Sequence, residues 1–391
     1  MASQVAGDVV VVGGGVIGLG VAWRAAQAGM AVTVVDRSPG RGASWAAAGM
    51  LAPVTEVHYG EQALLRLNLA AAGRWPAFAA ELEEAAGRQI GYRRCGTLTV
   101  ARDTDDNAEI EDLYRFQLRC GLEVERLRSR DCRRLEPGLA PGVRGGVLAP
   151  DDHQVDNRAM AGALLTACER AGVRLLADRV TELRLDGERV TGVTLAGGAS
   201  LAAATVVLAA GCWSGELGGL AAELLPPVRP VKGQLLQLRG PAADPLCRRN
   251  VRGLEVYVVP RADGRVVVGA TVEEQGFDTR VTAGAVHDLL RAAFELLPDV
   301  AELELVETVA GLRPGSPDNA PLLGPAGVDG LVVATGHYRN GILLAPVTAE
   351  AVAELLVGGR VPAAIVPFGP ARLQAGAAGQ HGRAQTARSA P

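Results

Sequence analysis

Apolar and polar positions near the amino terminus alternate as a strand, a turn, a helix and a second strand. The apolar runs 9–12 and 32–35 flank a glycine cluster and a small-residue helix. Gly13 permits the tight turn after the first strand, Gly15 lets the backbone approach a pyrophosphate, and Gly18 lets the helix pack closely on the sheet. Asp36 ends the second strand, where its carboxylate can accept hydrogen bonds from ribose hydroxyls. The pattern predicts a dinucleotide-binding unit that could take NAD or FAD, with an ordinary glycine turn as the alternative.

Two later apolar runs, 205–210 and 331–335, are typical of parallel strands buried on both faces. Gly211 follows the first run, so we expect it at the sheet edge that borders the ligand crevice. The second run leads through a glycine-flanked loop, 336–341, into a helix that extends to Leu355. A nicotinamide enzyme usually completes its cofactor domain in one block, so this late return favours a longer cofactor such as FAD. Backbone N–H groups and the helix dipole at the loop could stabilise the negative charge of a reduced flavin.

The rest of the chain predicts a second region with an antiparallel sheet. Alternation between 228 and 309 indicates strands at 233–239, 255–259 and 265–270, with a helix at 283–297. Before it we expect an amphipathic helix over 64–86, strands within 89–100, a helix over 157–171 that Asp156 caps, and strands at 173–176, 180–185 and 190–195. The small-residue stretch 41–50 would either let a ligand approach the backbone or pack as a helix on the sheet.

The composition fits a two-domain globular protein. The chain has 391 residues with 48% hydrophobic content and a net charge of −4, which argues against a nucleic-acid partner. Five arginines within 126–134 alternate with acidic residues and predict a solvated face. The six cysteines show neither C-x-x-C pairs nor nearby histidines, which predicts free thiols and no metal site. Without a signal-peptide pattern or an uninterrupted apolar segment of membrane-spanning length, we expect a cytoplasmic protein with no membrane association.

Several separate motifs resemble those of the glycine oxidases, FAD-dependent flavoenzymes of thiamine biosynthesis in the D-amino-acid oxidase superfamily. The resemblance covers nearly the whole chain up to about Pro367. The motifs are G-x-G-x-x-G at 13–18, AAGML at 47–51, VKG at 231–233, YVVPR at 257–261 with VGAT at 268–271, AGLRPG at 310–315 and GHYRNGILLAP at 336–346.

The resemblance implies an α/β fold of the D-amino-acid oxidase type, in which a Rossmann-like FAD-binding domain is interleaved with an antiparallel-sheet α+β substrate domain. The FAD-binding domain would comprise residues 5–85, 150–222 and 325–368, and the substrate-binding domain residues 86–149 and 223–324. Residues 370–391, rich in Ala, Gly, Gln and Arg, would form a disordered tail.

The resemblance also implies the site residues. Noncovalent FAD would contact Val16, Ile17, Asp36, Arg37, Ala43, Ser44, Ala48, Gly49, Met50, Val180, His337, Tyr338, Arg339, Asn340, Gly341, Ile342 and Leu343. The substrate would meet Tyr257, Arg313 and Arg339, which we take as the catalytic residues. An amino-acid carboxylate suits the planar, permanently charged fork of arginine, and a phenol adds one directed donor. Pro314, Gly315 and Pro317 would hold Arg313 on a rigid loop.

The implied reaction is oxidative deamination by hydride transfer from a neutral amine to flavin N5, with the carboxylate held by Arg313 and Tyr257. Glycine would give the imine, glyoxylate and ammonia, and oxygen would give hydrogen peroxide. The imine could alternatively pass to a thiazole synthase, and the protein could form homo-oligomers. We assign no base catalysis to His337.

Three other functions stay open at the level of sequence. An oxidase or dehydrogenase for sarcosine or a D-amino acid would differ in the pocket volume around Tyr257 and Val272. A flavin-binding subunit without turnover would not need Tyr257, Arg313 and Arg339 together, and a nicotinamide dehydrogenase would be colourless. The superfamily often has proline where this chain has Asn157, a departure from which we expect no effect on the chemistry.

Overall fold

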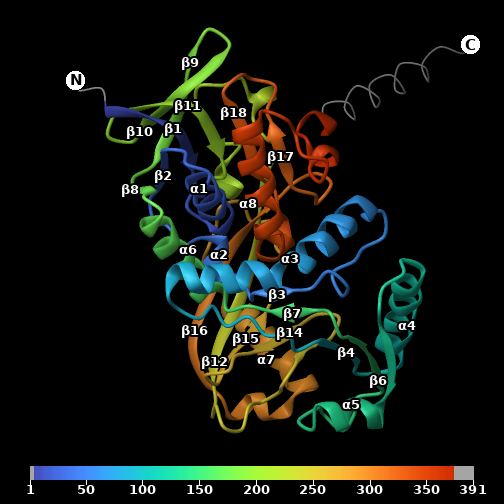
Figure 1. Cartoon of the computed structure of the whole chain (residues 1–391). Helices are drawn as coiled ribbons and strands as arrows, with labels where there is room; N and C mark the ends of the chain where they lie inside the picture. Colours follow the sequence, from blue (N-terminus) through green and yellow to red (C-terminus); the bar gives the residue numbers. More distant parts are fainter. Residues whose placement is uncertain (1–3, 374–391) are drawn as a thin grey trace, which may run out of the picture. The chain divides into compact units, whose positions relative to one another are not determined.

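Residues 4–373 are described by a computed structural model, in which the chain forms two compact units (Figure 1). Of the described residues, the first unit comprises 4–41, 164–230 and 313–373, and the second comprises Gly42–Ala163 and Val231–Leu312. Residues 42–85 and 150–163, which the sequence predicted to belong to the FAD-binding domain, group here with the second sheet. Which of these residues contact the cofactor stays a prediction.

The first unit is built on a largely parallel sheet in the order β17-β18-β11-β1-β2-β8. β1 pairs in parallel with β2 and β11, β11 with β18, and β2 with β8, whereas β17 is antiparallel to β18 and the β9–β10 hairpin extends from β11. The strands are β1 (Gln4–Val12), β2 (Val32–Asp36), β8 (Arg174–Ala177), β9 (Val180–Asp186), β10 (Arg189–Leu195), β11 (Ser200–Leu208), β17 (Leu322–Pro325) and β18 (Leu331–Thr335).

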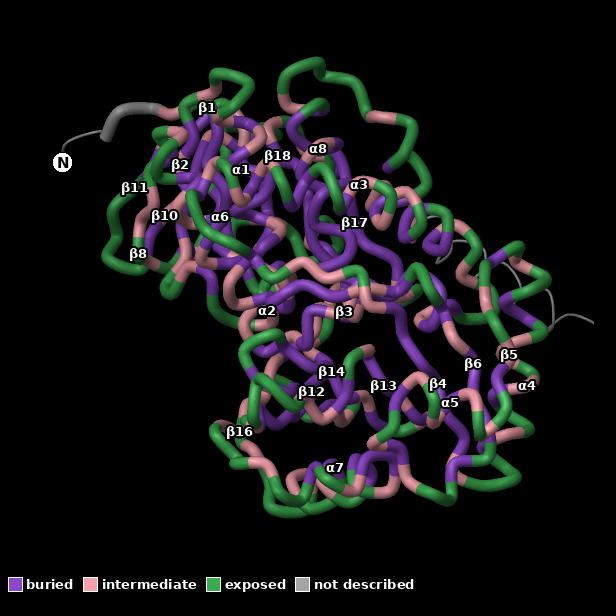
Figure 2. Tube along the Cα trace, turned by 60° about the horizontal axis from the view of Figure 1, so that its bottom comes forward, coloured by how far each residue is buried: buried purple, intermediate pink, exposed green. Residues whose placement is uncertain are grey.

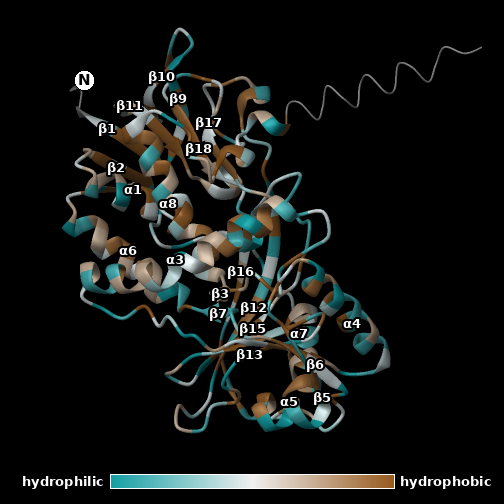
Figure 3. Ribbon diagram, turned by 45° about the vertical axis from the view of Figure 1, so that its right-hand side comes forward, coloured by the Kyte–Doolittle hydropathy of each residue, from teal (hydrophilic) through white to brown (hydrophobic). Residues whose placement is uncertain are grey.

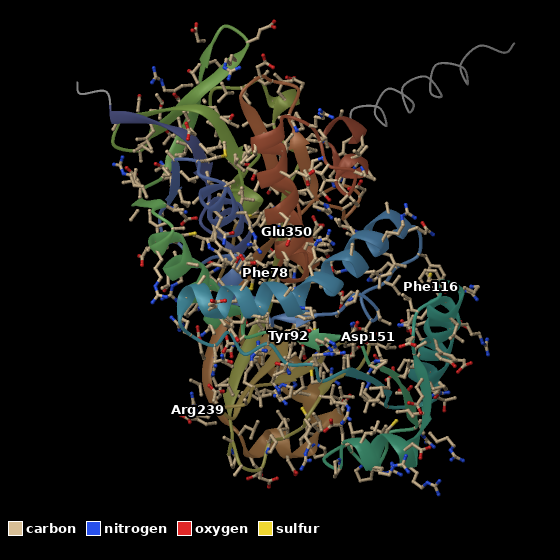
Figure 4. All side chains as sticks on the ribbon, in the orientation of Figure 1. Phe78, Tyr92, Phe116, Asp151, Arg239 and Glu350 are labelled. Atoms are coloured by element: carbon tan, nitrogen blue, oxygen red, sulfur yellow. The ribbon has the colours of Figure 1, made fainter. Side chains whose placement is uncertain are left out.

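The central strands of this sheet are buried because helices cover them. The strand residues 9–12 and 206–208 are each at most 4% exposed, and Figures 2 and 3 show the same strands as buried and hydrophobic. α1 (Val16–Gln27) packs on α8 (Gly341–Gly358), where a Cβ on Gly20 would lie 3.2 Å from that of Ala349. Arg24 of α1 also pairs at 3.9 Å with Glu350 of α8, which Figure 4 labels. The apolar runs 9–12, 205–210 and 331–335 are thus confirmed as buried parallel strands.

The second unit contains a sheet in the order β16-β12-β15-β14-β13-β4-β6-β5, antiparallel between β12, β15, β14 and β13, and a two-stranded sheet of β3 and β7. Its strands are β3 (Met50–Leu51), β4 (Thr97–Ala101), β5 (Glu125–Arg128), β6 (Gly145–Ala149), β7 (His153–Gln154), β12 (Arg229–Arg239), β13 (Asn250–Arg252), β14 (Tyr257–Pro260), β15 (Arg265–Gly269) and β16 (Glu304–Gly315).

Helices of the second unit pack against these sheets. They are α2 (Ala43–Ala46), α3 (Gln62–Ala86), α4 (Thr104–Arg119), α5 (Ser129–Leu135) and α7 (Ala283–Leu296), and α6 (Asn157–Arg170) leads into the first unit. Figure 4 labels Phe78 of α3 and Tyr92: Phe78 meets the Trp75 ring edge to face at 5.5 Å, and Tyr92 stacks on it at 6.1 Å. Tyr92 in turn contacts His153 of β7 at 6.2 Å. These rings connect α3 to the small β3–β7 sheet.

Short 3-10 helices complete both units. They are η1 (Gly211–Trp213), η2 (Ala222–Leu224), η3 (Pro298–Glu302), η4 (Tyr338–Asn340) and η5 (Val366–Phe368).

Two expectations from the sequence are wrong in detail. The window 89–100 contains one strand, β4, because Gly91 and Gly96 adopt positive φ angles of 68° and 74° that interrupt extended backbone. Residues 313–315 continue strand β16 instead of forming a loop. Pro314 is tolerated there because β16 lies at the edge of its sheet, where a missing N–H costs no ladder hydrogen bond.

The carboxyl-terminal segment also differs from expectation. The helical segment Tyr338–Gly358 is apolar and long enough to cross a membrane by length and composition, but 67% of its most apolar window is buried inside the protein, as in a core helix. Residues 370–373, predicted to begin a disordered tail, are ordered: Arg372 pairs with Asp318 at 2.8 Å, and Leu373 packs on the core of the first unit. The remainder of the predicted tail, 374–391, lies outside the described residues.

Candidate functional site

Four of the predicted cofactor positions lie at one edge of the first unit's sheet. Val12 is paired with Val35 and with Leu208, and Leu208 is paired with Val333. Because these pairings are parallel, the carboxyl ends of β1, β2, β11 and β18 share one edge. The residues there are Gly13, Asp36, Gly211 and His337, and we call this region the sheet edge.

The glycine turn of the sheet edge is required by sterics. Gly13 has a φ of 108°, and a Cβ on it would lie 2.3 Å from the carbonyl oxygen of Ala209. A Cβ on Gly18 would lie 1.9 Å from the carbonyl oxygen of Gly13. Gly15 is the N-cap of α1 and has no side chain that could cap the helix, and the N-terminus of a helix is the end that favours an anion.

Asp36 is fixed by backbone donors. Its carboxylate accepts hydrogen bonds from the N–H groups of Gly14 and Ser38, both at 2.7 Å. A carboxylate offers about four lone-pair sites, so the two oxygens can still accept further hydrogen bonds. Val180 begins β9 and packs in the core cluster that includes Val12 and Val35, close behind this edge. The exposed Arg37 follows Asp36 directly.

The loop after β18 buries a neutral histidine and an amide. Burial lowers the pKa of His337 to about 3, and its Nε2 lies 3.0 Å from Thr348 Oγ1. This hydrogen-bonded, uncharged imidazole supports the prediction that His337 is no general base. Asn340 is the N-cap residue of α8, and its Nδ2 is one of the buried atoms without a hydrogen-bond partner in the described part of the chain.

The segments that carry two of the three predicted substrate residues are adjacent in the fold. Gly315 forms an isolated antiparallel bridge with His337, so the segments that carry Arg313 and Arg339 lie side by side in the first unit. Both side chains are half-buried. Tyr257 is also half-buried but belongs to the second unit, where a Cβ on Gly269 would approach its hydroxyl to 2.5 Å. That the three side chains meet one substrate stays a prediction, and Val272 is 67% exposed.

The remaining predicted cofactor residues form the small-residue segment, 43–50, in the second unit. Its four-residue helix α2 is followed by an extended turn in which Gly49 has a φ of 70°. A Cβ on Gly49 would lie 2.0 Å from the carbonyl oxygen of Val155, and Met50 pairs with Gln154. The segment is therefore packed closely against β7. It is neither a regular helix nor a strand over its full length.

Asn157 has a larger role than the sequence suggested. Its buried amide donates to the carbonyl oxygens of Ser44 at 2.8 Å and Trp45 at 3.1 Å. That this departure from proline has no effect on the chemistry stays a prediction, but Asn157 does fix the backbone of the neighbouring segment. The cause is invisible locally, because a helix-start residue reaches a backbone more than 100 positions earlier. Asp156 caps the same helix as predicted, accepting from the N–H groups of Arg158 and Ala159.

Sequence reasoning missed Arg261, which directly follows β14. Its guanidinium donates to the carbonyl oxygen of Ala48 at 2.6 Å and to the side-chain oxygens of Gln154 at 2.5 Å and Asn157 at 3.3 Å. Burial lowers the pKa of Arg261 to about 10, while Asp156 opposes this shift, so the side chain keeps its charge at neutral pH. A charged residue immediately after an apolar strand run was the available signal.

The buried lysine and the cysteines of the chain were not predicted as site residues. Lys232 is 1% exposed and pairs with Asp278 at 3.1 Å. All six cysteines are free thiols, and burial raises the pKa of Cys168 and Cys212 to about 12, which makes them poor nucleophiles. Within residues 4–373, no cluster of three or more His, Cys, Asp or Glu side chains could hold a metal ion.

Comparison with known protein families identifies the family of the chain. Residues 8–355 match the family described as FAD dependent oxidoreductase, abbreviated DAO. The chain belongs to this family. Its cofactor is therefore FAD, and its fold is of the D-amino-acid oxidase type.

Similar proteins give finer detail about this FAD-dependent oxidoreductase. A glycine oxidase of Pseudomonas aeruginosa is 38% identical over 93% of this chain and 98% of its own length. The crystal structure of glycine oxidase from Geobacillus kaustophilus has a TM-score of 0.86 at 35% identity, with 94% of this chain and 98% of that chain covered. The bifunctional protein ThiO/ThiG of Synechocystis is 37% identical over 95% of this chain, which spans about half, 54%, of that relative's length.

The residues present fit FAD. The sheet edge combines glycines that leave no room for a Cβ with a helix start that has no capping side chain, the arrangement that admits a pyrophosphate. The buried Asn340 Nδ2 at the start of α8 is a donor suited to an acceptor atom of the cofactor. Within the first unit, Gly13, Gly15, Gly18, Asp36 and the 337–343 loop would hold FAD.

Proposed function

We propose that the chain catalyses the FAD-dependent oxidative deamination of glycine and other small amines. The observation that carries this proposal is the similarity to glycine oxidases over nearly the full length of both chains, at 38% identity in one case. The adjacent segments that carry Arg313 and Arg339 support it, because a guanidinium group suits an amino-acid carboxylate and these segments could direct two of them to one substrate. The products would be the imine or glyoxylate, ammonia and hydrogen peroxide.

The protein's own contribution to this reaction is positioning and electrostatics. Arg313, supported by Arg339, would bind the carboxylate as a fork, and Tyr257 would donate a hydrogen bond to it. The cationic arginines would disfavour the ammonium form of the substrate, so the amine would lose its proton without a dedicated base. When bound, FAD supplies the chemistry of the oxidation by accepting a hydride at N5 from the substrate α carbon.

We further propose that the product serves thiazole synthesis in thiamine biosynthesis. The supporting observation is that relatives named bifunctional protein ThiO/ThiG contain a region similar to this chain as about half of their length. A thiazole synthase would then be the functional partner, acting as a separate protein or a fused one. The free cysteines support a reducing, cytoplasmic location. Association into homo-oligomers is part of the same proposal.

The substrate is tested by anaerobic mixing of the purified holoprotein with glycine, sarcosine and D-alanine, following loss of the flavin absorbance. We expect glycine to bleach the flavin at lower concentration than the other two. Faster bleaching by sarcosine or D-alanine would replace the proposed substrate. Bleaching by none of the three would favour a flavin-binding subunit without turnover.

The carboxylate role of Arg313 is tested with Arg313→Ala. If the pair with the substrate carboxylate is desolvated, kcat/KM for glycine falls by a factor equivalent to about 3 kcal/mol or more. Arg291→Ala, on the exposed side of α7, is the matched control and should leave kcat/KM unchanged. An Arg313→Ala enzyme with wild-type efficiency would refute the role.

A further inference from the structure

We propose that Arg261 is a positioning residue for the flavin: it fixes the carbonyl side of the small-residue segment, so that the backbone at 48–50 keeps the conformation in which FAD binds. The proposal rests on the proposed function, because the flavin contacts of Ala48, Gly49 and Met50 come from the glycine oxidase resemblance. All the interactions that carry it lie within the second unit.

The first observation is that three carbonyl groups of the segment point into one buried polar cluster. Asn157 takes the carbonyls of Ser44 and Trp45, and Arg261 takes that of Ala48. Arg261 and Asn157 are themselves hydrogen-bonded at 3.3 Å. With its carbonyls bound in this way, the segment can present its other side to a ligand.

The second observation is that the cluster is anchored deep in the sheet. Gln154 accepts from Arg261 and donates to Asn250 Oδ1 at 3.1 Å. Asn250 donates in turn to Thr97 Oγ1 at 3.2 Å and to the carbonyl of His153. Each of these side chains is at most 5% exposed, apart from His153, whose backbone alone takes part. The segment is thereby tied to β4 and β13 through a continuous chain of hydrogen bonds.

The third observation is that β14 carries the predicted substrate tyrosine and leads directly into Arg261. Alternate residues of a strand share a face, so Tyr257 and Val259 point the same way, and Arg261 follows directly after the end of the strand. Val259 and Tyr257 pack in a cluster with Ala48 and Met50. A single strand therefore fixes Tyr257 and the small-residue segment in one frame.

An arginine suits this task because its planar group supplies several donors to separate acceptors at once. Its nearest carboxylate, that of Asp156, is held by Arg265 and by the amino-terminal N–H groups of α6. Arg261 thus donates its hydrogen bonds to uncharged oxygen atoms. Loss of the side chain would leave three buried acceptors without this donor and release the carbonyl of Ala48.

The experiment measures FAD affinity by titrating apoprotein and following the quenching of flavin fluorescence, together with the visible spectrum of the bound flavin. We expect Arg261→Ala to raise the Kd for FAD at least tenfold and to shift the flavin absorption bands. Arg261→Lys should recover part of the affinity, since it restores one donor. Arg291→Ala, an exposed arginine of the same unit, should bind FAD like the wild type.

A folded Arg261→Ala protein with a Kd within twofold of the wild type and an unchanged spectrum would overturn the proposal. If Arg261→Ala does not fold by circular dichroism, Arg261→Lys and Gln154→Ala decide by the same two measurements. Both should then weaken FAD binding at least threefold, and wild-type binding by both would overturn the proposal. Neither readout uses glycine, so a wild-type protein that binds FAD but ignores glycine would refute the proposed substrate and leave this role intact.

Discussion

The sheet edge and the small-residue segment are both predicted to contact FAD, yet they are held in different ways. At the sheet edge, the turn is fixed by backbone geometry and by one nearby carboxylate, with Gly14 donating to Asp36 at 2.7 Å. In the small-residue segment, the backbone is fixed by buried side chains from far along the chain, Asn157 and Arg261. The sheet edge is thus held by its own backbone geometry, whereas the small-residue segment is held by hydrogen bonds from side chains that are distant in the sequence.

This difference explains how each region tolerates change. A glycine turn fails when any Cβ is added, because the clash is with backbone atoms that cannot move aside. A segment held by hydrogen bonds from distant side chains loses its conformation when those donors are removed, even though its own sequence is unchanged. Substitutions can therefore damage the two regions separately.

The largest effect is expected for Gly18→Ala at the sheet edge. Its Cβ would lie 1.9 Å from the carbonyl oxygen of Gly13, so the turn or α1 must shift. We expect the free energy of unfolding to fall by about 3 kcal/mol or more and the purified protein to lose its flavin. Urea denaturation and the ratio of flavin to protein absorbance measure the two effects.

Gly73→Ala is the matched control in helix α3, where a Cβ would meet no atom within 4 Å. This change should stabilise the protein by up to about 1 kcal/mol, because alanine favours the helix over glycine. A Gly18→Ala protein that keeps wild-type stability and a full complement of flavin would show that the turn is not fixed by sterics.

The same contrast explains which parts of the structure could be predicted. The sheet edge is encoded contiguously, as an apolar run, spaced glycines and an acidic residue, so β1, α1, β2 and the strands β11 and β18 follow from the sequence. The edge strand β16 did not, because Pro314 and Gly315 are typical of a loop and edge position is a tertiary property. The two-residue strands β3 and β7 carry no periodicity at all.

For the candidate site, the sequence could supply the contiguous motifs but not the supports between them. Arg261 lies more than 200 positions from the Ala48 carbonyl that it binds, and local pattern carries no information on such a contact. The bridge between Gly315 and His337, which pairs the Arg313 and Arg339 segments, likewise appears only in the fold.

The next largest effect is expected for Asn157→Ala, which removes hydrogen bonds that hold the small-residue segment. The change removes the buried amide donor of the Ser44 and Trp45 carbonyls, of which Trp45 keeps a hydrogen bond from Arg158 Nε at 3.3 Å, and it costs about 2 kcal/mol in the free energy of unfolding. Asn157→Asp keeps an acceptor for Arg261 but loses the amide donors, so it should weaken FAD binding as well. Equal stability of all three proteins in urea would mean that the segment holds its shape unaided.

The two regions also differ in the charge of their buried basic side chains, and this difference makes the contribution of His337 to stability depend on pH. Arg261 keeps its charge, whereas His337 has a pKa of about 3, well below the 6.5 of an exposed histidine. Between these two values the unfolded chain binds a proton that the folded chain excludes. The contribution of His337 to stability is therefore full above pH 6.5 and falls as the pH drops towards 3, by about 1.4 kcal/mol per pH unit.

The pH effect is measured as the difference between the wild type and His337→Asn in urea titrations of apoprotein from pH 4.5 to 6.5. The difference is needed because burial raises the pKa of Asp152 to about 6, so the folded chain binds an extra proton there and the slope has the opposite sign. Both proteins contain Asp152, and its contribution cancels. Identical slopes for the two proteins would show that His337 is not buried as a neutral group.

The smallest effect is expected for Asp36→Asn, which weakens the sheet edge without adding bulk. The amide can still accept from one backbone N–H group, but it loses the charge and one of the two acceptor oxygens. Charged hydrogen bonds exceed neutral ones by about 1 kcal/mol, so FAD affinity should fall roughly fivefold with little change in the apoprotein. If Asp36→Asn instead unfolds the apoprotein while Gly18→Ala does not, the carboxylate and not the glycine turn fixes this edge, and the comparison between the two regions would have to be redrawn around side chains in both.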